Sequence, residues 1–128
     1  MGFQTISARE LNLCVRDGRR IIIDLRSTQE YGACHIRGVV NLPYEELEQM
    51  LSAAGKSGRT AVYEALSRRG FPTGNLLKQE LVLYCERGAT SMAAARELAE
   101  LGFRVKSVVG GIRAYRGPYL AGTDRRLR

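Results

Sequence analysis

The sequence predicts an α/β protein in which a central, mostly parallel sheet carries helices on both faces. Short aliphatic runs, such as residues 20–25, are typical of buried strands. Segments with apolar residues at helical spacing separate these runs. Strands that alternate with helices along a chain pair in parallel, so this order favours a sheet covered on both sides. The length of 128 residues and the hydrophobic content of 45% suit one domain with a buried core.

The first predicted elements are a helix over residues 8–16 and a strand over residues 20–25. Ser7 and Glu10 have the spacing of a capping box, in which two side chains bond the backbone N–H groups at a helix start. Gly18 tolerates the left-handed conformation that commonly ends a helix. The β-branched run that follows is apolar at successive positions, as expected for a central strand buried on both faces.

The next segment is predicted to hold a short helix, a short strand and a longer helix. Ser27 and Glu30 form a second capping box, and the helix that they open stops at Gly32. The strand is expected over residues 38–42, and the longer helix over residues 44–51.

Residues 52–79 interrupt this regular order. Gly and Pro residues punctuate the stretch, which predicts an irregular insertion that contains one helix over residues 60–69. The rest of the chain is expected to complete one domain over residues 1–128, with a basic C-terminal tail over about 117–128.

After the insertion, strands and helices are predicted to alternate again. The elements are a strand over 80–84, a helix that Thr90 or Ser91 caps and that ends at Gly102, a strand over 105–109 and a short helix over 112–115.

Charge and cysteine content narrow the classes of function. The net charge is +7, and residues 113–128 carry five Arg against one Asp. Such a balance favours anions, but no groove-reading helix or aromatic-rich basic strand accompanies it, so no nucleic-acid partner is expected. No apolar run is long enough to span a membrane, and the N-terminus does not resemble a secretory signal. Three cysteines without metal-type spacing favour a reducing compartment, so a cytoplasmic protein is expected. No motif in the sequence implies a metal or an organic cofactor.

Cys85 is the strongest candidate for a reactive residue. It follows a predicted buried strand and precedes a predicted helix, so its thiol faces a helix N-terminus. The partial positive charge and unpaired N–H groups of a helix start favour the thiolate, which is the nucleophilic form. The substrate is expected to bind to the loop that follows, which consists of Glu86, Arg87, Gly88, Ala89, Thr90 and Ser91. The alternative is a buried structural cysteine.

Several motifs, in their order and spacing, resemble the rhodanese-like domain. The resemblance covers the chain from about Ile6 to Arg116. The motifs are Ile23-Asp24-Leu25-Arg26, Glu30-Tyr31, the run from His35 to Pro43, Tyr84-Cys85 with Gly88 and Ser91, and Gly110-Gly111 before a short helix.

This resemblance implies a rhodanese-like fold and a sulfurtransferase that works through a persulfide on Cys85. The sulfane sulfur would come from thiosulfate or a persulfide donor and pass to a thiol or cyanide, and a sulfur-relay protein is a further candidate partner. The resemblance assigns Asp24, Arg26 and His35 to supporting the pocket. Gly110-Gly111 is expected to allow close backbone packing beside the loop. Members of this family that have lost the activity act as binding or redox-sensing modules, which is the alternative function.

The chain departs from the family pattern at two positions. Active loops often read Cys-x-x-Gly-x-Arg-Ser, and Thr90 stands at the position of the arginine. Arg87 is then the one cation inside the loop, and it points either into the pocket or to solvent. This change weakens the case for thiosulfate more than the case for Cys85. Cys34 replaces the usual glycine before His35 and is either a small apolar filler or a resolving thiol for Cys85.

Phosphatase or arsenate reductase chemistry, which related folds support, is not expected. Those reactions need an arginine six residues after the cysteine to clamp a tetrahedral oxyanion, and this position is Ser91.

Overall fold

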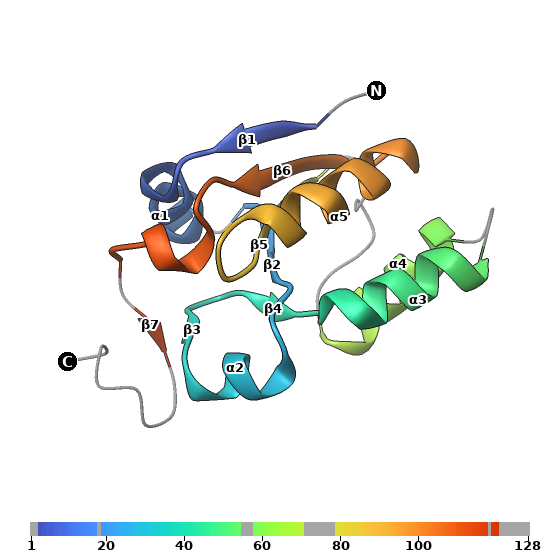
Figure 1. The fold of residues 1–128 in the computed structure, drawn as a ribbon, viewed down its shortest axis with the longest axis horizontal. Helices are drawn as coiled ribbons and strands as arrows, with labels where there is room; N and C mark the ends of the chain where they lie inside the picture. The colour runs from blue at the N-terminus through green and yellow to red at the C-terminus, as the bar shows by residue number, and fades with distance from the viewer. Residues whose placement is uncertain (1–2, 18, 55–57, 71–78, 118, 121–128) are drawn as a thin grey trace.

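A computed structural model describes residues 3–17, 19–54, 58–70, 79–117 and 119–120 of the chain (Figure 1). Its elements, in chain order, are β1 (Gln4–Ile6), α1 (Ala8–Asp17), β2 (Ile21–Asp24), α2 (Thr28–Ala33), β3 (His35–Ile36), β4 (Val40–Asn41), α3 (Tyr44–Ala54), α4 (Gly58–Arg68), β5 (Glu80–Tyr84), α5 (Ala89–Glu100), β6 (Arg104–Val108), the 3-10 helix η2 (Gly111–Ala114) and β7 (Tyr119–Leu120).

Five strands form the central sheet in the order β1-β6-β5-β2-β4, and every neighbouring pair is parallel. β3 and β7 pair in the antiparallel sense as a separate small sheet. In the central sheet Asp24 lies opposite both Tyr84 and Asn41, so the carboxyl ends of β2, β4 and β5 meet at one edge. The predicted α/β class with a mostly parallel sheet is confirmed.

Alternate residues of the strands bury their side chains in two hydrophobic clusters, one on each face of the sheet. Ile21 and Ile23 belong to the cluster that α3, α4 and α5 cover, whereas Ile22 belongs to the one that α1 and η2 cover. Successive strand residues point to opposite faces, so helices on both sides require an apolar residue at every position. This requirement explains why the run at residues 20–25 shows no polar alternation before Asp24.

The helix predicted within residues 52–79 exists as α4 and is part of the core. Val62, Ala65 and Leu66 are fully buried against the sheet. Residues 55–57 and 71–78 lie outside the described residues, as do residue 118 and the tail over 121–128. The prediction of an irregular insertion therefore stays a prediction for the segments that flank α4.

The predicted cap of the helix after Cys85 is wrong. α5 begins at Ala89, and its N-cap is Gly88, which has a φ of 113° and no side chain to bond the helix start. Ser91 lies inside the first turn, and its hydroxyl donates to the Gly88 carbonyl at 3.1 Å. The positive φ that glycine tolerates lets the chain turn straight into the helix, so no capping hydroxyl is needed.

Three short strands, β1, β3 and β7, are absent from the sequence-based expectations. Each has two or three residues, too few for a periodic pattern to appear in the sequence. No helix in the described part of the chain combines the length and the apolar character that a membrane crossing needs.

Candidate functional site

Cys85 directly follows the central strand β5, at the sheet edge where the carboxyl ends of β2, β4 and β5 meet. Its side chain is only 5% exposed. The Sγ atom accepts hydrogen bonds from the backbone N–H groups of Gly88 at 3.0 Å and Ser91 at 3.4 Å. Both donors belong to the turn into α5, so the loop curls around the sulfur. Such a group of backbone N–H donors stabilises an anion at the position of Sγ.

The close approach of the loop to the segment after β6 fixes the position of Cys85. Its carbonyl accepts a hydrogen bond from Ile112 N at 2.9 Å. A Cβ added to Gly111, whose φ is 61°, would lie 2.5 Å from the Cys85 carbonyl oxygen. Position 111 therefore requires a glycine, which agrees with the close backbone packing expected of Gly110-Gly111.

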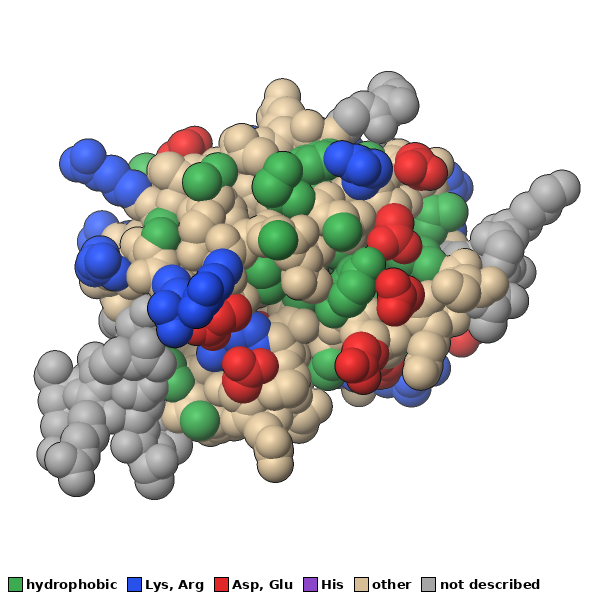
Figure 2. All heavy atoms as spheres, viewed as in Figure 1, with side chains coloured by type: hydrophobic (Ala, Val, Ile, Leu, Met, Phe, Trp, Pro, Cys, Tyr) green, Lys and Arg blue, Asp and Glu red, His purple; other side chains and the backbone are tan. Residues whose placement is uncertain are grey.

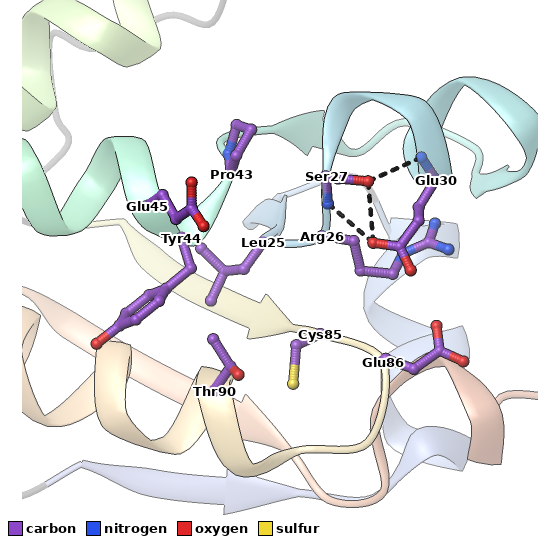
Figure 3. Close-up of a pocket in the computed structure, with 10 residues that line it drawn as sticks. All are labelled: Leu25, Arg26, Ser27, Glu30, Pro43, Tyr44, Glu45, Cys85, Glu86 and Thr90. Atoms are coloured by element: carbon purple, nitrogen blue, oxygen red, sulfur yellow. Dashed lines mark hydrogen bonds between the residues drawn. The ribbon is translucent and has the colours of Figure 1, made fainter.

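A pocket of about 350 Å³ opens at Cys85 (Figure 3). Its lining consists of Leu25, Arg26, Ser27, Glu30, Pro43, Tyr44, Glu45, Cys85, Glu86 and Thr90. Figure 3 shows the sulfur of Cys85 between Thr90 on one side and the end of β2 and the start of α2 on the other. The starts of α2, α3 and α5 thus all contribute to one cavity around the sulfur.

Arg87 is exposed and is not among the residues that line this pocket. The sequence left open whether the Arg87 side chain points into the pocket or to solvent. In the structure it points to solvent. The arginine in the pocket wall is Arg26, which follows β2 and is distant from Cys85 in sequence. Thr90 lines the pocket at the position where the family pattern has its arginine.

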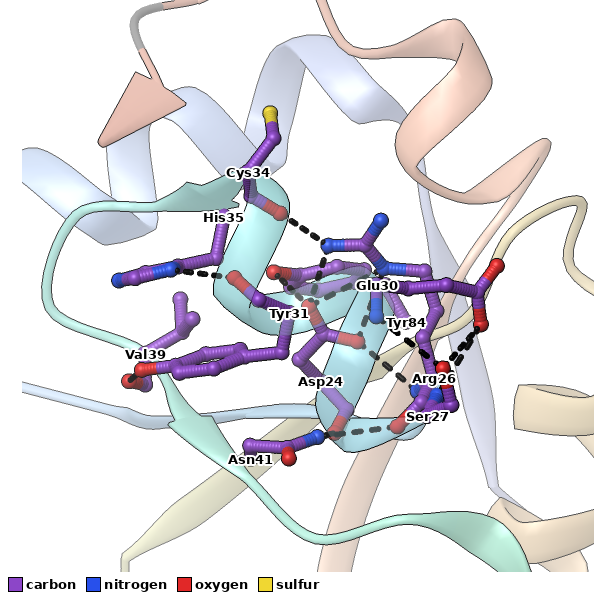
Figure 4. A network of polar contacts seen from close by, with 10 residues as sticks. All are labelled: Asp24, Arg26, Ser27, Glu30, Tyr31, Cys34, His35, Val39, Asn41 and Tyr84. Carbon is purple, nitrogen blue, oxygen red and sulfur yellow. Dashed lines mark hydrogen bonds and ion pairs between the residues drawn. The ribbon is translucent and has the colours of Figure 1, made fainter. Parts of the chain in front are cut away.

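The buried pair of Asp24 and Arg26 holds the edge of the sheet together (Figure 4). The Arg26 guanidinium donates to Asp24 at 2.8 Å and to the Cys34 carbonyl at 2.6 Å, which links β2 to the end of α2. The Tyr84 hydroxyl donates to Asp24 at 2.8 Å, which links β2 to β5. Asp24 is fully buried and Arg26 is 8% exposed, and Arg26 also lines the pocket, so this buried network adjoins the pocket wall.

These contacts fix the protonation states of Tyr84 and Arg26. Burial, together with the charge of Asp24, raises the pKa of Tyr84 far above its ordinary value, so its hydroxyl keeps the proton that it donates. Burial works against the charged form of Arg26, but its hydrogen bonds to Asp24 raise its pKa. Arg26 therefore remains a cation whose charge Asp24 balances.

His35 and Cys34 lie next to this network but outside the lining of the pocket. The His35 ring stacks on Tyr31 at 3.8 Å between centroids, and its Nδ1 lies 2.8 Å from the Tyr31 carbonyl oxygen. Cys34 is 2% exposed, and its carbonyl accepts the bond from Arg26. The structure thus gives His35 contacts that order the segment after α2 and does not bring it to the sulfur.

The sequence reasoning missed several residues at the site. Tyr44, from the start of α3, donates a hydrogen bond to Glu97 of α5 at 3.0 Å, and burial and this bond raise its pKa to about 12. Ser107 of β6 lies 2.7 Å from the Ser91 hydroxyl and anchors the first turn of α5. The sequence offered one signal for Tyr44, because this residue directly follows Pro43 at the end of the family motif. Nothing in the sequence distinguishes Ser107.

No three His, Cys, Asp or Glu side chains gather closely enough to hold a metal ion within the ranges that the structure describes.

Comparison with known proteins agrees with this geometry. Residues 7–117 match the rhodanese-like domain family. The human thiosulfate:glutathione sulfurtransferase is 31% identical over 118 residues, which are 92% of this chain and 91% of that protein. The structure of the human single-domain sulfurtransferase TSTD1 superposes with a TM-score of 0.67 and 29% identity, covering 88% of this chain and 95% of that one. BH2092 from Bacillus halodurans, with a TM-score of 0.65 and 23% identity over 91% of this chain and 76% of its own, shares the fold. The chain therefore belongs to the rhodanese-like domain family.

Proposed function

We propose that the chain is a sulfurtransferase that carries sulfane sulfur as a persulfide on Cys85. One observation carries the proposal: Cys85 Sγ lines an open pocket and accepts two backbone hydrogen bonds, from Gly88 and Ser91. The same donors that stabilise a thiolate can stabilise the negative charge of a persulfide as it forms and as it reacts.

The reaction proceeds in two displacements. In the first, the Cys85 thiolate attacks the outer sulfur of thiosulfate, the S–S bond of the donor breaks, and sulfite leaves with the electron pair. A persulfide donor reacts in the same way and leaves as a thiolate. In the second, a thiolate or cyanide attacks the outer sulfur of the Cys85 persulfide. The new S–S or C–S bond forms, the S–S bond to Cys85 Sγ breaks, and Cys85 leaves with the electron pair as a thiolate.

Similarity to the human thiosulfate:glutathione sulfurtransferase supports thiosulfate and a thiol as the first donor and acceptor to test. The presence of Thr90 in the pocket wall favours a second candidate, a module that binds a partner or senses redox state without turnover. Without an arginine at this position, an anionic donor lacks its usual partner.

Intact-mass measurement distinguishes these two functions. The purified chain is incubated with thiosulfate and, separately, with a small persulfide, beside a Cys85→Ala variant. A gain of one sulfur atom that is lost in the variant is the expected result. If neither donor adds sulfur to the native chain, the sulfurtransferase proposal is wrong and the binding module remains.

Thr90→Arg is expected to raise kcat/KM for thiosulfate by about tenfold or more, because a hydrogen bond to a charged group contributes about 1.5–3 kcal/mol. Thr90 lines the pocket, so the new guanidinium would face the donor beside Cys85. Steady-state kinetics with thiosulfate and with a small persulfide, which carries less negative charge, measure the effect. Thr90→Gln is the matched control, which adds length without charge. Equal rates for the two variants would show that the missing charge does not limit the use of thiosulfate.

A further inference from the structure

The pocket that holds Cys85 is acidic, although the chain as a whole carries a net charge of +7. Glu30, Glu45 and Glu86 all line it. Figure 2 shows acidic side chains over α2, α3 and α5 on this face, whereas Lys and Arg gather along the edge formed by α1 and η2. We call the three glutamates the acidic rim.

Cations near the pocket cancel only part of this charge. The charge of Arg26 is balanced by Asp24, and its side chain is only 6% exposed. Glu86 pairs with Arg113 at 2.8 Å, so Arg113 offsets part of its charge, although a pair at the surface is weak. In the described part of the chain, neither Glu30 nor Glu45 takes part in an ion pair.

The helices explain why glutamates stand at two of these positions. Glu30 and Glu45 lie in the first turns of α2 and α3, where a carboxylate stabilises the helix N-terminus. The Glu30 carboxylate also accepts a hydrogen bond from Ser27 N at 3.1 Å in its capping box, so its position is fixed. Because both helices start at the pocket, their stabilising charges also act on whatever enters it (Figure 3).

We propose that the acidic rim makes Cys85 transfer its sulfur preferentially to a thiol that carries a positive charge next to its sulfur. The inference rests on the proposed function and names the class of acceptor for the same site. The thiolate of the acceptor attacks the outer sulfur of the Cys85 persulfide, the S–S bond breaks toward Cys85, and the acceptor leaves as a persulfide. A cationic group on the acceptor approaches the three glutamates during this step, whereas an anionic group is repelled by them.

The test uses three small acceptors that differ mainly in charge: cysteamine, 2-mercaptoethanol and 3-mercaptopropionate. The chain is first loaded with sulfur from a small persulfide, and loading is verified by intact mass. After the donor is removed, each acceptor is added, and the loss of one sulfur atom is followed in time. The readout is the ratio of the rate with cysteamine to the rate with 3-mercaptopropionate, because the intrinsic reactivity of each thiol cancels when variants are compared.

Glu45→Gln is expected to lower this ratio by about fivefold. This is the effect in water of removing one charge that acts across about 8 Å on the charged group of the acceptor, when the two acceptors differ by two charge units. Glu45→Gln combined with Glu86→Gln should lower the ratio further, since the second change also frees the positive charge of Arg113. Glu100→Gln is the matched control, because this exposed residue ends α5 about 16 Å along the helix from Ala89. The native ratio should also shrink between about 0.02 M and about 0.5 M salt.

Each outcome has a definite meaning. A lower ratio in the rim variants, with no change in the control, supports the inference. Equal ratios in all variants, with persulfide formed in the loading step, overturn the inference and leave the proposed function intact. If no persulfide forms in the loading step, the proposed function is wrong, and the inference fails with it.

Discussion

Asp24→Ala is expected to lower the free energy of unfolding by about 3–5 kcal/mol, because it leaves a buried arginine without its counter-charge. The Asp24 carboxylate accepts bonds from the Arg26 backbone N–H at 2.9 Å, from the Arg26 guanidinium and from the Tyr84 hydroxyl. The Arg26 side chain is 6% exposed, so water cannot replace the lost partner in place. Urea unfolding followed by circular dichroism measures the change.

Asp17→Ala is the matched control, because Asp17 also pairs with an arginine, Arg20, at 2.7 Å, but at the surface. A surface pair of this kind contributes about 0–1 kcal/mol. If Asp24→Ala does not fold well enough to measure, Asp24→Asn, which keeps the size and one acceptor oxygen, provides an intermediate loss. Replacing Arg26 by methionine in the Asp24→Ala background should recover part of the stability, because it removes the unpaired charge. Losses of equal size in the two aspartate variants would refute the role of the buried pair.

The sequence could predict the parts of the fold that depend on local pattern. The two capping boxes place their serine and glutamate side chains as expected, with Glu10 N donating to Ser7 Oγ at 3.0 Å and Glu30 N donating to Ser27 Oγ at 3.1 Å. The β-branched run at residues 20–25 contains the interior strand β2, Ile21–Asp24, because a strand buried on both faces carries its own signal.

The walls of the pocket could not be predicted in the same way. Arg26 and Glu45 reach Cys85 only because β2 and β5 are neighbours in the sheet and α3 begins beside their ends. That proximity follows from the order of the strands, which no local pattern contains. The predicted start of α5 is wrong for a related reason. The positive φ of Gly88 replaces a capping side chain, and the only sign of this backbone conformation in the sequence is the glycine itself.

Cys85→Ser is expected to reduce sulfur transfer by at least about 1000-fold, the scale on which enzymes lose activity when a covalent nucleophile is removed. A serine hydroxyl fits the space and can still accept hydrogen bonds from the N–H groups of Gly88 and Ser91. It does not ionise near neutral pH and forms no stable persulfide, so both displacements fail. The rate of thiocyanate formation from thiosulfate and cyanide measures the loss, with the small persulfide as the donor in a parallel assay.

The other two cysteines provide controls within the same chain. Burial raises the pKa of the Cys14 thiol, so it stays protonated, and Cys14→Ser should keep the full rate of sulfur transfer. Cys34→Ser tests the resolving-thiol hypothesis: if Cys34 closes a disulfide on Cys85, mildly oxidised native protein shows a Cys34–Cys85 cross-link that this variant lacks. Cys34 is buried, and its carbonyl accepts a hydrogen bond from the Arg26 guanidinium. A cross-link to Cys85 would therefore require the end of α2 to move. Sulfur transfer that survives Cys85→Ser and disappears in either of the other variants would assign the persulfide to another cysteine and contradict the mechanism.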